Sequence, residues 1–315
     1  MAIPVLSGEE VLRALPMERA ITAARRAFLA QARGEGAAPQ RISMPVQGSE
    51  GTGTTLVMPV HLPGAALVTK VVSVYPENPA RGQQTIQGLV LVLDESTGAP
   101  LAILDAPTLT GLRTGAASAV ATDLLAPRDA RVLGLVGCGV QGWYQALGQA
   151  QVRPLESIRL WSRDRGRAEL LGQKLAGRLG IEAVVVSEPP EAARGAQLVC
   201  MATPASTPLL GPEDLPERCH VNAVGSFRAD MMEFAPGICE SADVWVDDPG
   251  AVLAESGELI AAIAAGVCTQ SQLRPLAGLV QGAVEAGSSR RSLFKSVGFG
   301  LLDAAAAAAV LGGPE

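Results

Sequence analysis

Two basic residues stand where basic side chains are unusual. Lys70 lies inside an apolar run, Leu67–Val72, whose composition predicts a strand with at least one buried face. Arg113 is the only charged residue among the small residues 110–119. A desolvated lysine has a lowered pKa and can exchange a proton near neutral pH, and a guanidinium holds a carboxylate through two parallel hydrogen bonds. The pair therefore predicts a site that binds a small carboxylic acid and transfers a proton.

Both residues also have simpler explanations. Lys70 could point into water from an alternating strand, and Arg113 could form a structural salt bridge. Arg41 and Thr85 are weaker candidates for the same site, because an arginine at a strand end and a threonine in a loop are ordinary.

A second candidate site lies at Arg131–Gly142, RVLGLVGCGVQG, where an apolar run leads into G-x-G-x-x-G. A strand before this motif and a helix after it are typical of a dinucleotide-binding loop. Gly137 would allow the tight turn, Gly139 the approach of a pyrophosphate, and Gly142 the close packing of the helix. The pyrophosphate would lie at the positive end of that helix. The alternative is a tight strand–helix turn without a ligand.

The end of the next strand, Ser157–Trp161, indicates which dinucleotide is bound. An acid there binds the ribose 2′-OH of NAD, whereas arginine accommodates the 2′-phosphate of NADP. Here Ser162 follows the strand, and arginines stand at positions 163, 165 and 167. We therefore expect NADP(H), with NAD(H) as the alternative. Asp164 comes one residue late for ribose binding and could instead pair with a neighbouring arginine.

The five cysteines and two histidines do not predict a metal site. The cysteines are odd in number and lack the C-x-x-C spacing of zinc sites. Cys138 and Cys200 are expected to be small buried residues. Cys219 and His220 are unsuited to a nucleophilic pair, because neighbours on a strand point to opposite faces. We expect chemistry without a metal ion.

Composition limits the classes of partner. The 315 residues are 48% hydrophobic, enough for two ordinary cores, and carry a net charge of −6. The basic residues are dispersed, which argues against nucleic acid or anionic lipid as a partner. The longest apolar tract, Ala304–Leu311, is far shorter than the roughly 20 residues of a membrane span, and Glu9 and Glu10 argue against a signal peptide. We expect a soluble, cytoplasmic protein.

Hydrophobic periodicity predicts an α/β protein with two domains. Residues 8–37 have helical spacing, residues 41–104 predict an antiparallel sheet, and residues 105–126 return to a helix. Strands and helices then alternate from 132 to 246, which predicts a doubly wound parallel sheet of the Rossmann type. The alanine-rich tail, 290–311, predicts one long buried helix that crosses back to the first domain.

These elements place a substrate domain at 1–125 and an NAD(P)-binding Rossmann domain at 126–299, with helix 300–315 packed back on the first. In the Rossmann domain we expect strands at 132–136, 157–161, 182–186, 197–201, 219–224 and 243–246, and helices at 141–151, 165–179 and 189–194.

An ordered set of segments resembles the ornithine cyclodeaminase/mu-crystallin family over nearly the whole chain, which is far more specific than the glycine motif alone. The segments are Arg41, KVVSVYPENP (70–79), QTIQG (84–88), DESTGAPLA (94–102), LTGLRTGAASA (109–119), GCGVQG (137–142), VGSFRADMME (224–233) and LFKSVGFGLLD (293–303).

The resemblance implies a homodimer in which the β domains pair, and a Rossmann domain that carries NAD(P). It implies that Arg41, Lys70, Thr85 and Arg113 line the substrate cleft, and that Lys70 and Arg113 hold the substrate carboxylate. The residues expected to contact the cofactor are Thr114, Gly137, Gly139, Val140, Gln141, Gly142, Ser162, Arg163, Arg167, Ala202, Thr203, Val224, Gly225, Ser226, Val297 and Gly298.

One position departs from part of the family. Ornithine cyclodeaminases, and the alanine dehydrogenases similar to them, have an aspartate where this chain has Phe227. Phenylalanine can neither accept a proton nor balance an ammonium group. Asp230 or Glu233 could replace the missing carboxylate only after a rearrangement of the loop. Phe227 instead offers an apolar face to a cyclic, uncharged substrate, and we expect it to contact the substrate.

The pattern G-x-F-x-x-D-M-x-E resembles family members that reduce cyclic ketimines such as 1-pyrroline-2-carboxylate and 1-piperideine-2-carboxylate, although Ala229 stands where proline is usual. W-S-R at 161–163 resembles the NADPH-using mu-crystallin branch. The sequence thus predicts an NAD(P)H-dependent oxidoreductase for the C–N bond of a small amino or imino acid, with Lys70 and Arg113 as catalytic residues. Ornithine cyclodeaminase, alanine dehydrogenase and a non-catalytic cofactor- or hormone-binding protein are the alternatives.

Overall fold

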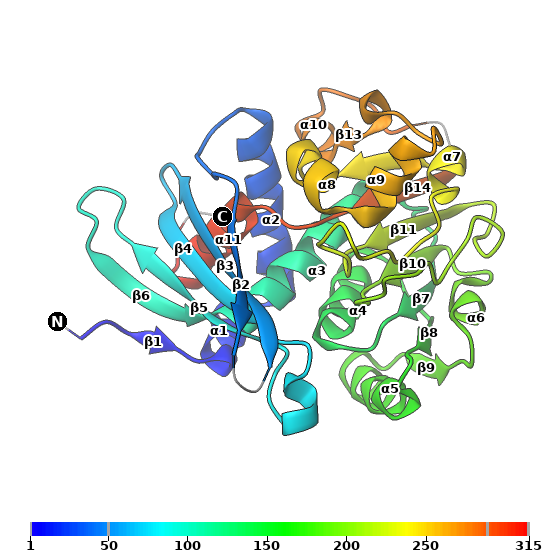
Figure 1. Ribbon diagram of the computed structural model, residues 1–315, viewed down its shortest axis with the longest axis horizontal. Helices are drawn as coiled ribbons and strands as arrows, with labels where there is room; N and C mark the ends of the chain where they lie inside the picture. Colours follow the sequence, from blue (N-terminus) through cyan, green and yellow to red (C-terminus); the bar gives the residue numbers. More distant parts are fainter. Residues whose placement is uncertain (1, 49–50, 288–289, 314–315) are drawn as a thin grey trace. The chain divides into compact units, whose positions relative to one another are not determined.

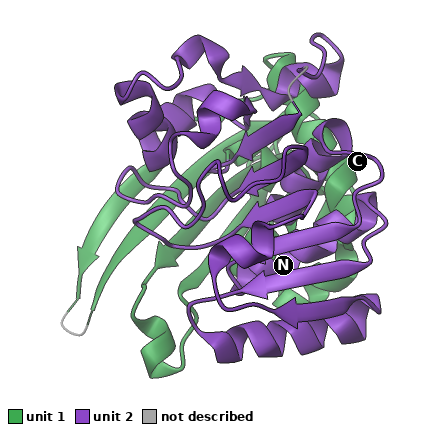
Figure 2. Cartoon of the chain, turned by 90° about the vertical axis from the view of Figure 1, so that its right-hand side faces the viewer, with its two compact units in different colours: residues 1–113, 299–315 green, residues 114–298 purple. Residues whose placement is uncertain are grey.

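The computed structural model describes residues 2–48, 51–287 and 290–313, and the chain divides into two compact units. The first unit combines residues 1–113 with 299–315, and the second comprises residues 114–298 (Figure 2). The division lies inside helix α3 (Ala106–Leu125), whereas the boundary expected from the sequence follows residue 125. The difference arises because this helix continues from the last strand of the first sheet into the second unit.

Six strands form the sheet of the first unit, in the order β1-β6-β5-β4-β3-β2 (Figure 1). All neighbours are antiparallel except β1 and β6, so the expected antiparallel sheet is confirmed. Strand β1 has two residues and therefore no periodic signal in the sequence. The strands are β1 (Val5–Leu6), β2 (Ile42–Gln47), β3 (Thr52–Leu62), β4 (Ala66–Val74), β5 (Ile86–Leu93) and β6 (Pro100–Asp105).

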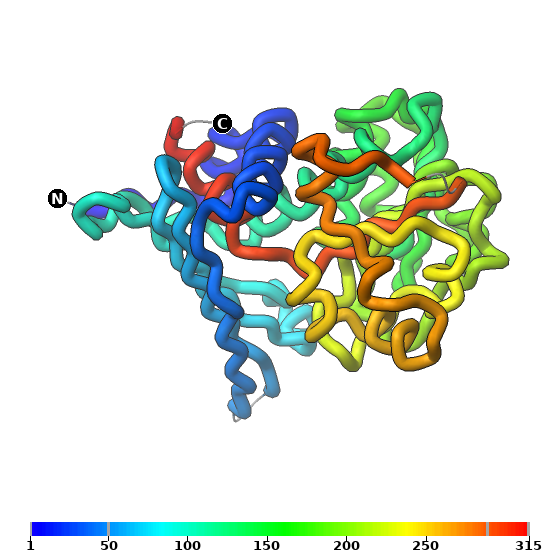
Figure 3. The backbone as a smooth tube through the Cα atoms, turned by 90° about the horizontal axis from the view of Figure 1, so that it is seen from above, coloured from blue at the N-terminus to red at the C-terminus, as the bar shows by residue number. Residues whose placement is uncertain are grey.

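Three helices of the first unit come from the two ends of the chain. The expected helical region at 8–37 contains α1 (Gly8–Ala14) and α2 (Met17–Ala32), separated at Pro16, which has no backbone N–H to donate. The third helix, α11 (Gly300–Val310), packs against α2, β3 and β4 (Figures 1 and 3). All residues of α11 are buried, because its alanine side chains are small enough for close neighbours on every side.

Side chains alternate between the two faces of this sheet. Met58 and Val60 on β3 and Val68 and Val72 on β4 are buried on the same face. Helix α11 covers this face so closely that a Cβ atom at Gly300 would lie 3.1 Å from the Cβ atom of Val60. The opposite face is half exposed. The first unit therefore has one closed core and one open sheet face.

The second unit is built on an eight-stranded sheet with the order β13-β12-β14-β11-β10-β7-β8-β9, in which all neighbours are parallel. The strand order reverses direction between β7 and β10, as in Rossmann folds. The strands are β7 (Val132–Val136), β8 (Ser157–Trp161), β9 (Glu182–Val185), β10 (Leu198–Met201), β11 (Cys219–Ala223), β12 (Asp243–Val246), β13 (Arg274–Pro275) and β14 (Arg291–Lys295).

The parallel sheet has a hydrophobic cluster on each face. Leu198 and Cys200 of β10 belong to one cluster, and Val199 and Met201 of the same strand belong to the other. A strand buried on both faces is typical of a doubly wound sheet, which confirms the expected fold class. The helices of this unit are α4 (Val140–Val152), α5 (Arg165–Leu179), α6 (Pro189–Ala193), α7 (Ile238–Ser241), α8 (Pro249–Glu255), α9 (Gly257–Ala264) and α10 (Leu276–Gln281).

The predicted helix at 290–311 is wrong over its first part. Residues 291–295 form β14, which lies between β11 and β12, and α11 begins only at Gly300. A buried central strand is apolar on both faces, so its short apolar run has no period that distinguishes it from a helix. Gly298, with a φ of 81°, lies between the two elements in a conformation that a helix does not allow.

Within residues 2–48, 51–287 and 290–313, no helix combines the length and the apolar composition that crossing a bilayer would need.

Candidate functional site

Lys70 lies on the buried face of β4, where it shares the core side of the strand with valines. In the sheet it is opposite Met58 on β3 and Val90 on β5, both of which are buried. Only 2% of its side chain is exposed. The lysine therefore points into the core of the first unit and not into water.

A buried aspartate binds both basic residues that the sequence analysis singled out. Lys70 Nζ donates a hydrogen bond to Asp303 Oδ2 at 2.7 Å, and Arg113 Nε donates to Asp303 Oδ1 at 3.1 Å. The Asp303 side chain is fully buried and that of Arg113 is 7% exposed. Arg113 thus forms a buried salt bridge, which was the structural alternative to a binding role. Its partner, Asp303, also binds Lys70.

Asp303 was not among the functional residues expected from the sequence. The usable signal was its position in α11, where it is the only charged residue of an otherwise apolar helix. A charge in such a helix is buried only when a partner of opposite charge is present. Arg113, the only charged residue of a stretch of small residues, lies well inside α3.

Burial and neighbouring charges shift the pKa values in this cluster. Burial lowers the pKa of Lys70 from 10.5 to about 8; Asp303 opposes this shift, and the charges of Arg113 and Arg41 add to it. Burial alone would raise the pKa of Asp303, but Lys70 and Arg113 bring it below its ordinary value. At neutral pH, Lys70 and Asp303 are therefore mainly ionised, and together with the guanidinium of Arg113 they place two positive charges beside one negative charge.

The other two residues expected in the substrate site lie in the same unit. Arg41 precedes β2 and is close enough for its charge to act on both Lys70 and Asp303. Thr85 lies in a bend before β5, where its carbonyl oxygen accepts a hydrogen bond from the Tyr75 backbone at 2.8 Å. The structure thus brings Arg41, Lys70 and Arg113 together, whereas among the described residues no hydrogen bond links Thr85 to any of them.

The glycine motif in the second unit has the geometry of a ligand-binding turn. Gly137 has a φ of 110°, and a Cβ atom there would lie 2.7 Å from the Ala202 carbonyl carbon. A Cβ atom at Gly142 would collide with the Gly137 carbonyl oxygen, so only glycine allows α4 to approach β7 this closely. At Gly139 a Cβ atom would meet nothing within 4 Å. Open space at the start of α4 fits a bound pyrophosphate.

Most residues expected to contact the cofactor follow the carboxyl ends of parallel strands, where ligands bind in such sheets. They lie in the loops after β7, β8, β10, β11 and β14, and Val140 and Gln141 begin α4. Backbone hydrogen bonds connect the strand ends: Gly137 to Trp161 at 2.8 Å, Ala202 to Val136 at 2.8 Å, Val224 to Met201 at 2.9 Å and Ser296 to Ala223 at 3.1 Å. These residues therefore share one edge of the second sheet, and Thr114 lies separately in α3.

The end of β8 holds the residues expected near a 2′-phosphate. Asp164 caps α5 by accepting a hydrogen bond from the Arg167 backbone, and it also forms an ion pair with the Arg167 side chain at 3.2 Å. Arg165 pairs with Glu169 at 3.0 Å. Arg163 is exposed and forms no ion pair within the described part of the chain. Ser162 and Arg163 are thus the groups best placed to meet an anion here.

Neither carboxylate near Phe227 is free to replace the missing aspartate. Asp230 binds the guanidinium of Arg228 through two hydrogen bonds of 2.9 Å. Glu233 is fully buried and accepts hydrogen bonds from the backbone of Thr203 and Ser226 among others. The rearrangement considered from the sequence would have to break these contacts.

Glu233 instead joins the loops after β10 and β11. One of its oxygens accepts from the Thr203 backbone at 2.6 Å and from the Thr203 hydroxyl at 3.0 Å. The other accepts from Gly225 at 2.6 Å and from Ser226 at 3.2 Å. Burial raises the pKa of Glu233, while Lys295 and the backbone donors oppose that shift. Glu233 thus connects, through hydrogen bonds, two loops that are expected to contact the cofactor.

Cys219 and His220 are both buried. Burial lowers the pKa of His220 to about 3 and raises the pKa of Cys219 to about 11. His220 bonds Ser292 and Asn222 with its two ring nitrogens, at 2.8 and 3.2 Å. Among the described residues, no three His, Cys, Asp or Glu side chains are grouped so that they could hold a metal ion.

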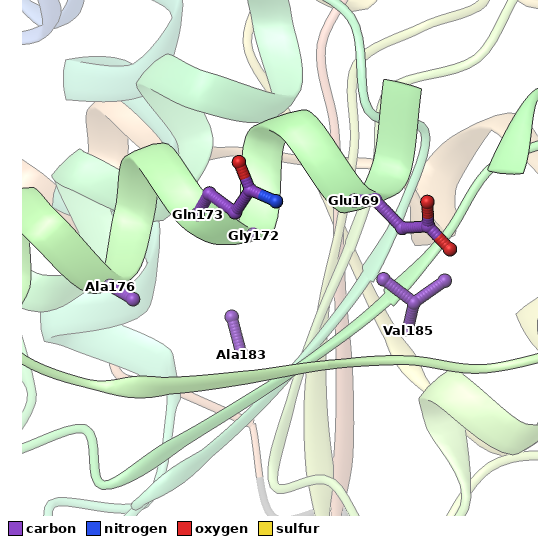
Figure 4. Close-up of a pocket in the computed structure, with 6 residues that line it drawn as sticks. All are labelled: Glu169, Gly172, Gln173, Ala176, Ala183 and Val185. Carbon is purple, nitrogen blue, oxygen red and sulfur yellow. The ribbon is translucent and has the colours of Figure 1, made fainter. Parts of the chain in front are cut away.

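A surface pocket of about 290 Å³ lies between α5 and the edge strand β9 (Figure 4). Glu169 and Gln173 are its polar residues, on α5, and Ala183 and Val185 line it from β9. None of the residues expected in the substrate or cofactor site lines this pocket. It is therefore separate from the candidate site.

Known proteins resemble this chain in both sequence and fold. The model of the ornithine cyclodeaminase/mu-crystallin family matches residues 3–312. A Delta(1)-pyrroline-2-carboxylate reductase of Bacillus cereus is 36% identical over 270 residues, which cover 84% of this chain and 82% of that protein.

Two solved structures have the same fold. That of Thermococcus litoralis Delta(1)-pyrroline-2-carboxylate reductase, in complex with NADH and L-proline, matches with a TM-score of 0.93 and 32% identity over 98% of this chain and 96% of that chain. An archaeal alanine dehydrogenase dimer with bound NAD matches with a TM-score of 0.89 and 28% identity over 98% of this chain and 95% of that chain.

Proposed function

The chain belongs to the ornithine cyclodeaminase/mu-crystallin family, and from that premise we propose that it is an NAD(P)H-dependent reductase of small cyclic imino acids. The proposed substrates are 1-pyrroline-2-carboxylate and 1-piperideine-2-carboxylate, whose C=N bond is reduced to an amine. The buried cluster of Lys70, Arg113 and Asp303 is the observation that carries this proposal, because it offers a positive charge and a proton in one place.

The charge of the cluster suits a carboxylate ligand. Lys70, Arg113 and Asp303 together leave one positive charge without a counter-charge, which is costly in a buried place. Arg113 uses Nε for Asp303, and its guanidinium has no other hydrogen bond within residues 2–48, 51–287 and 290–313. Its two Nη groups can therefore bind both oxygens of a carboxylate. We assign the substrate carboxylate to Arg113, with Lys70 and Arg41 adding positive charge.

We assign Lys70 as the donor of the proton that the imine nitrogen receives. Reduction of a C=N bond places a hydride on carbon and a proton on nitrogen. When bound, the reduced nicotinamide supplies the hydride. Burial brings the pKa of Lys70 to about 8, so its ammonium group is mainly protonated at neutral pH yet can release a proton to the imine nitrogen. A bound water molecule is the alternative proton donor.

The glycine turn fits a dinucleotide, since Gly139 leaves open space at the start of α4. Gly137, Gly142 and the loops after β10, β11 and β14 would hold it. We propose a preference for NADPH over NADH, because Ser162 stands where an acid would select NAD and Arg163 is available for a 2′-phosphate.

Phe227 favours reduction of a cyclic imine over cyclodeamination of ornithine. A cyclodeaminase would need a carboxylate here, and both nearby carboxylates are engaged, Asp230 by Arg228 and Glu233 by backbone donors. A phenylalanine side chain favours a cyclic, uncharged substrate body over a chain that ends in an ammonium group.

We also propose a cytoplasmic homodimer. The open face of the first sheet presents apolar side chains that a second copy would cover, including Ile42, Met44, Val57, Val71, Leu89 and Leu101. The similar archaeal alanine dehydrogenase was solved as a dimer. Five free thiols suit a reducing compartment.

The test follows NADPH and NADH oxidation at the nicotinamide absorbance with each of the two cyclic imines. Ornithine with NAD⁺ is assayed for ammonia in parallel, and pyruvate with ammonia and NADH tests alanine dehydrogenase activity. Rapid oxidation with a cyclic imine supports the proposal. Ammonia release from ornithine, with no activity on the imines, would overturn it.

A further inference from the structure

We infer that Asp303 is a positioning residue, which fixes Lys70 and Arg113 relative to each other and keeps the Lys70 ammonium group protonated for proton transfer. The inference deepens the proposed function and rests on it. Asp303 itself does not contact the substrate in this scheme, since each of its oxygens binds one of the two basic residues.

The two oxygens of the Asp303 carboxylate bind two different donors. Oδ2 accepts from Lys70 Nζ at 2.7 Å and Oδ1 accepts from Arg113 Nε at 3.1 Å. Lys70 comes from β4, Arg113 from α3 and Asp303 from the first turn of α11, so one side chain joins three elements of the first unit. Because the guanidinium is held through Nε, its Nη edge keeps a fixed direction for a ligand.

No neighbouring group can replace Asp303 as a counter-charge. The other charged groups that act on Lys70 are Arg113 and Arg41, and both are positive. The strands on either side of β4 place apolar Met58 and Val90 beside it. Asp303 is therefore the group that stabilises the ammonium form of Lys70, whereas burial and both arginines favour the neutral amine.

These contributions determine how the pKa of Lys70 changes when the charge of Asp303 is removed. The pKa of Lys70 is about 8 with Asp303 present, and Asp303 raises it through its charge and its hydrogen bond. Substituting Asp303 with asparagine removes the charge and keeps the shape. The pKa of Lys70 must then fall, so that the ammonium form is lost at a lower pH than in the wild type.

The test uses the small number of lysines in the chain. Only positions 70, 174 and 295 are lysine, so protein labelled with ¹³C-lysine has three ε-carbon signals, and Lys70→Arg identifies that of Lys70. Titration of the cofactor-free wild type and Asp303→Asn gives the pKa of Lys70 directly. We expect a decrease of about 1–3 units, the usual effect of removing an adjacent opposite charge. The exposed Lys174 provides an internal reference.

The rate of imine reduction is then measured against pH. The alkaline limb of kcat is expected to move to lower pH in Asp303→Asn by the same amount as the pKa of Lys70. Asp303→Glu restores the charge and should return the limb towards its wild-type position. Glu9→Gln, the same chemical change on exposed helix α1, is the control and should leave the profile unchanged.

An unchanged pKa of Lys70 in folded Asp303→Asn would overturn the inference, whatever the enzyme reduces. If the NMR shift is found but wild-type protein reduces no cyclic imine, the proposed function fails and the electrostatic role of Asp303 stands. If Asp303→Asn does not fold, Asp303→Ser, which also removes the charge, is titrated in the same way. A lower pKa of Lys70 in Asp303→Ser supports the inference, and an unchanged pKa overturns it.

Discussion

Arg113 and Lys70 share one carboxylate but differ in what they can still offer a ligand. Arg113 binds Asp303 through Nε, which leaves two parallel N–H groups, whereas Lys70 has a single ammonium group with a pKa of about 8. The first arrangement suits recognition of a carboxylate and the second suits proton transfer. At the scale of single residues, the cluster thus separates binding from proton transfer.

Arg113→Lys tests the binding role. Lysine keeps the positive charge beside Asp303 but lacks the paired N–H groups. We expect kcat/KM for 1-pyrroline-2-carboxylate to fall about tenfold to hundredfold, mainly through KM, as the loss of one charged hydrogen bond predicts. Steady-state NADPH oxidation measures this, and circular dichroism checks the fold. An unchanged KM would remove Arg113 from the carboxylate site.

Ser162→Asp tests the cofactor preference. An aspartate at the end of β8 would repel a 2′-phosphate and accept a hydrogen bond from a ribose 2′-OH. We expect kcat/KM to decrease with NADPH and to be maintained or increase with NADH. Arg165→Ser is the matched control, because Arg165 already pairs with Glu169. A preference that does not respond to Ser162→Asp would place the selective residue elsewhere.

At the scale of elements, small residues decide how closely helices approach strands. Gly142 lets α4 lie against β7, and Gly300 lets α11 lie against β3. Gly139, in contrast, has open space where a side chain would be. The same residue type therefore serves packing at two of these positions and leaves room for a ligand at the third.

Gly139→Ala and Gly142→Ala should separate these roles. Gly139 has a φ of −88°, which alanine adopts readily, so we expect unchanged stability but weaker NADPH binding. Gly142→Ala places its Cβ against the Gly137 carbonyl and should destabilise the protein by about 1–3 kcal/mol. Thermal unfolding and quenching of protein fluorescence by NADPH measure the two effects. Unchanged NADPH affinity in Gly139→Ala would contradict a cofactor at this turn.

At the scale of the whole molecule, the first unit buries one face of its sheet and leaves the other half exposed. Leu89, on the open face, is 41% exposed and lies between Val71 on β4 and Asp105 on β6. Ile42 and Met44 on the same face are 62% and 54% exposed, and apolar side chains gathered on one exposed face are typical of an interface. Pairing of two copies through this face would bury it.

Leu89→Lys should therefore yield a monomer in sedimentation velocity experiments, because a charge would have to be buried in the interface. The monomer should stay folded, since Leu89 is already partly in water. Leu170→Lys, at a position on α5 that is 68% exposed, is the control and should leave the dimer intact. A wild-type monomer, or a dimer that tolerates Leu89→Lys, would exclude this interface.

Local patterns in the sequence were sufficient to predict most helices and strands and the glycine turn. The alternation of valines around Lys70 predicted a buried strand face, and three glycines between strand and helix predicted the turn at β7, because both signals depend on residues close together in the chain. The resemblance to a family, carried by ordered segments, supplied the function that no single motif could specify.

Only the tertiary structure decided the partners of these residues. Asp303 lies 233 residues from Lys70 and 190 from Arg113, so no local pattern relates them. Residues 291–295 became a strand because β11 and β12 pair with them on either side, although their short apolar run could equally form a helix. Short-range periodicity determines which face of an element is apolar, whereas ion pairs and sheet neighbours depend on which distant segments meet.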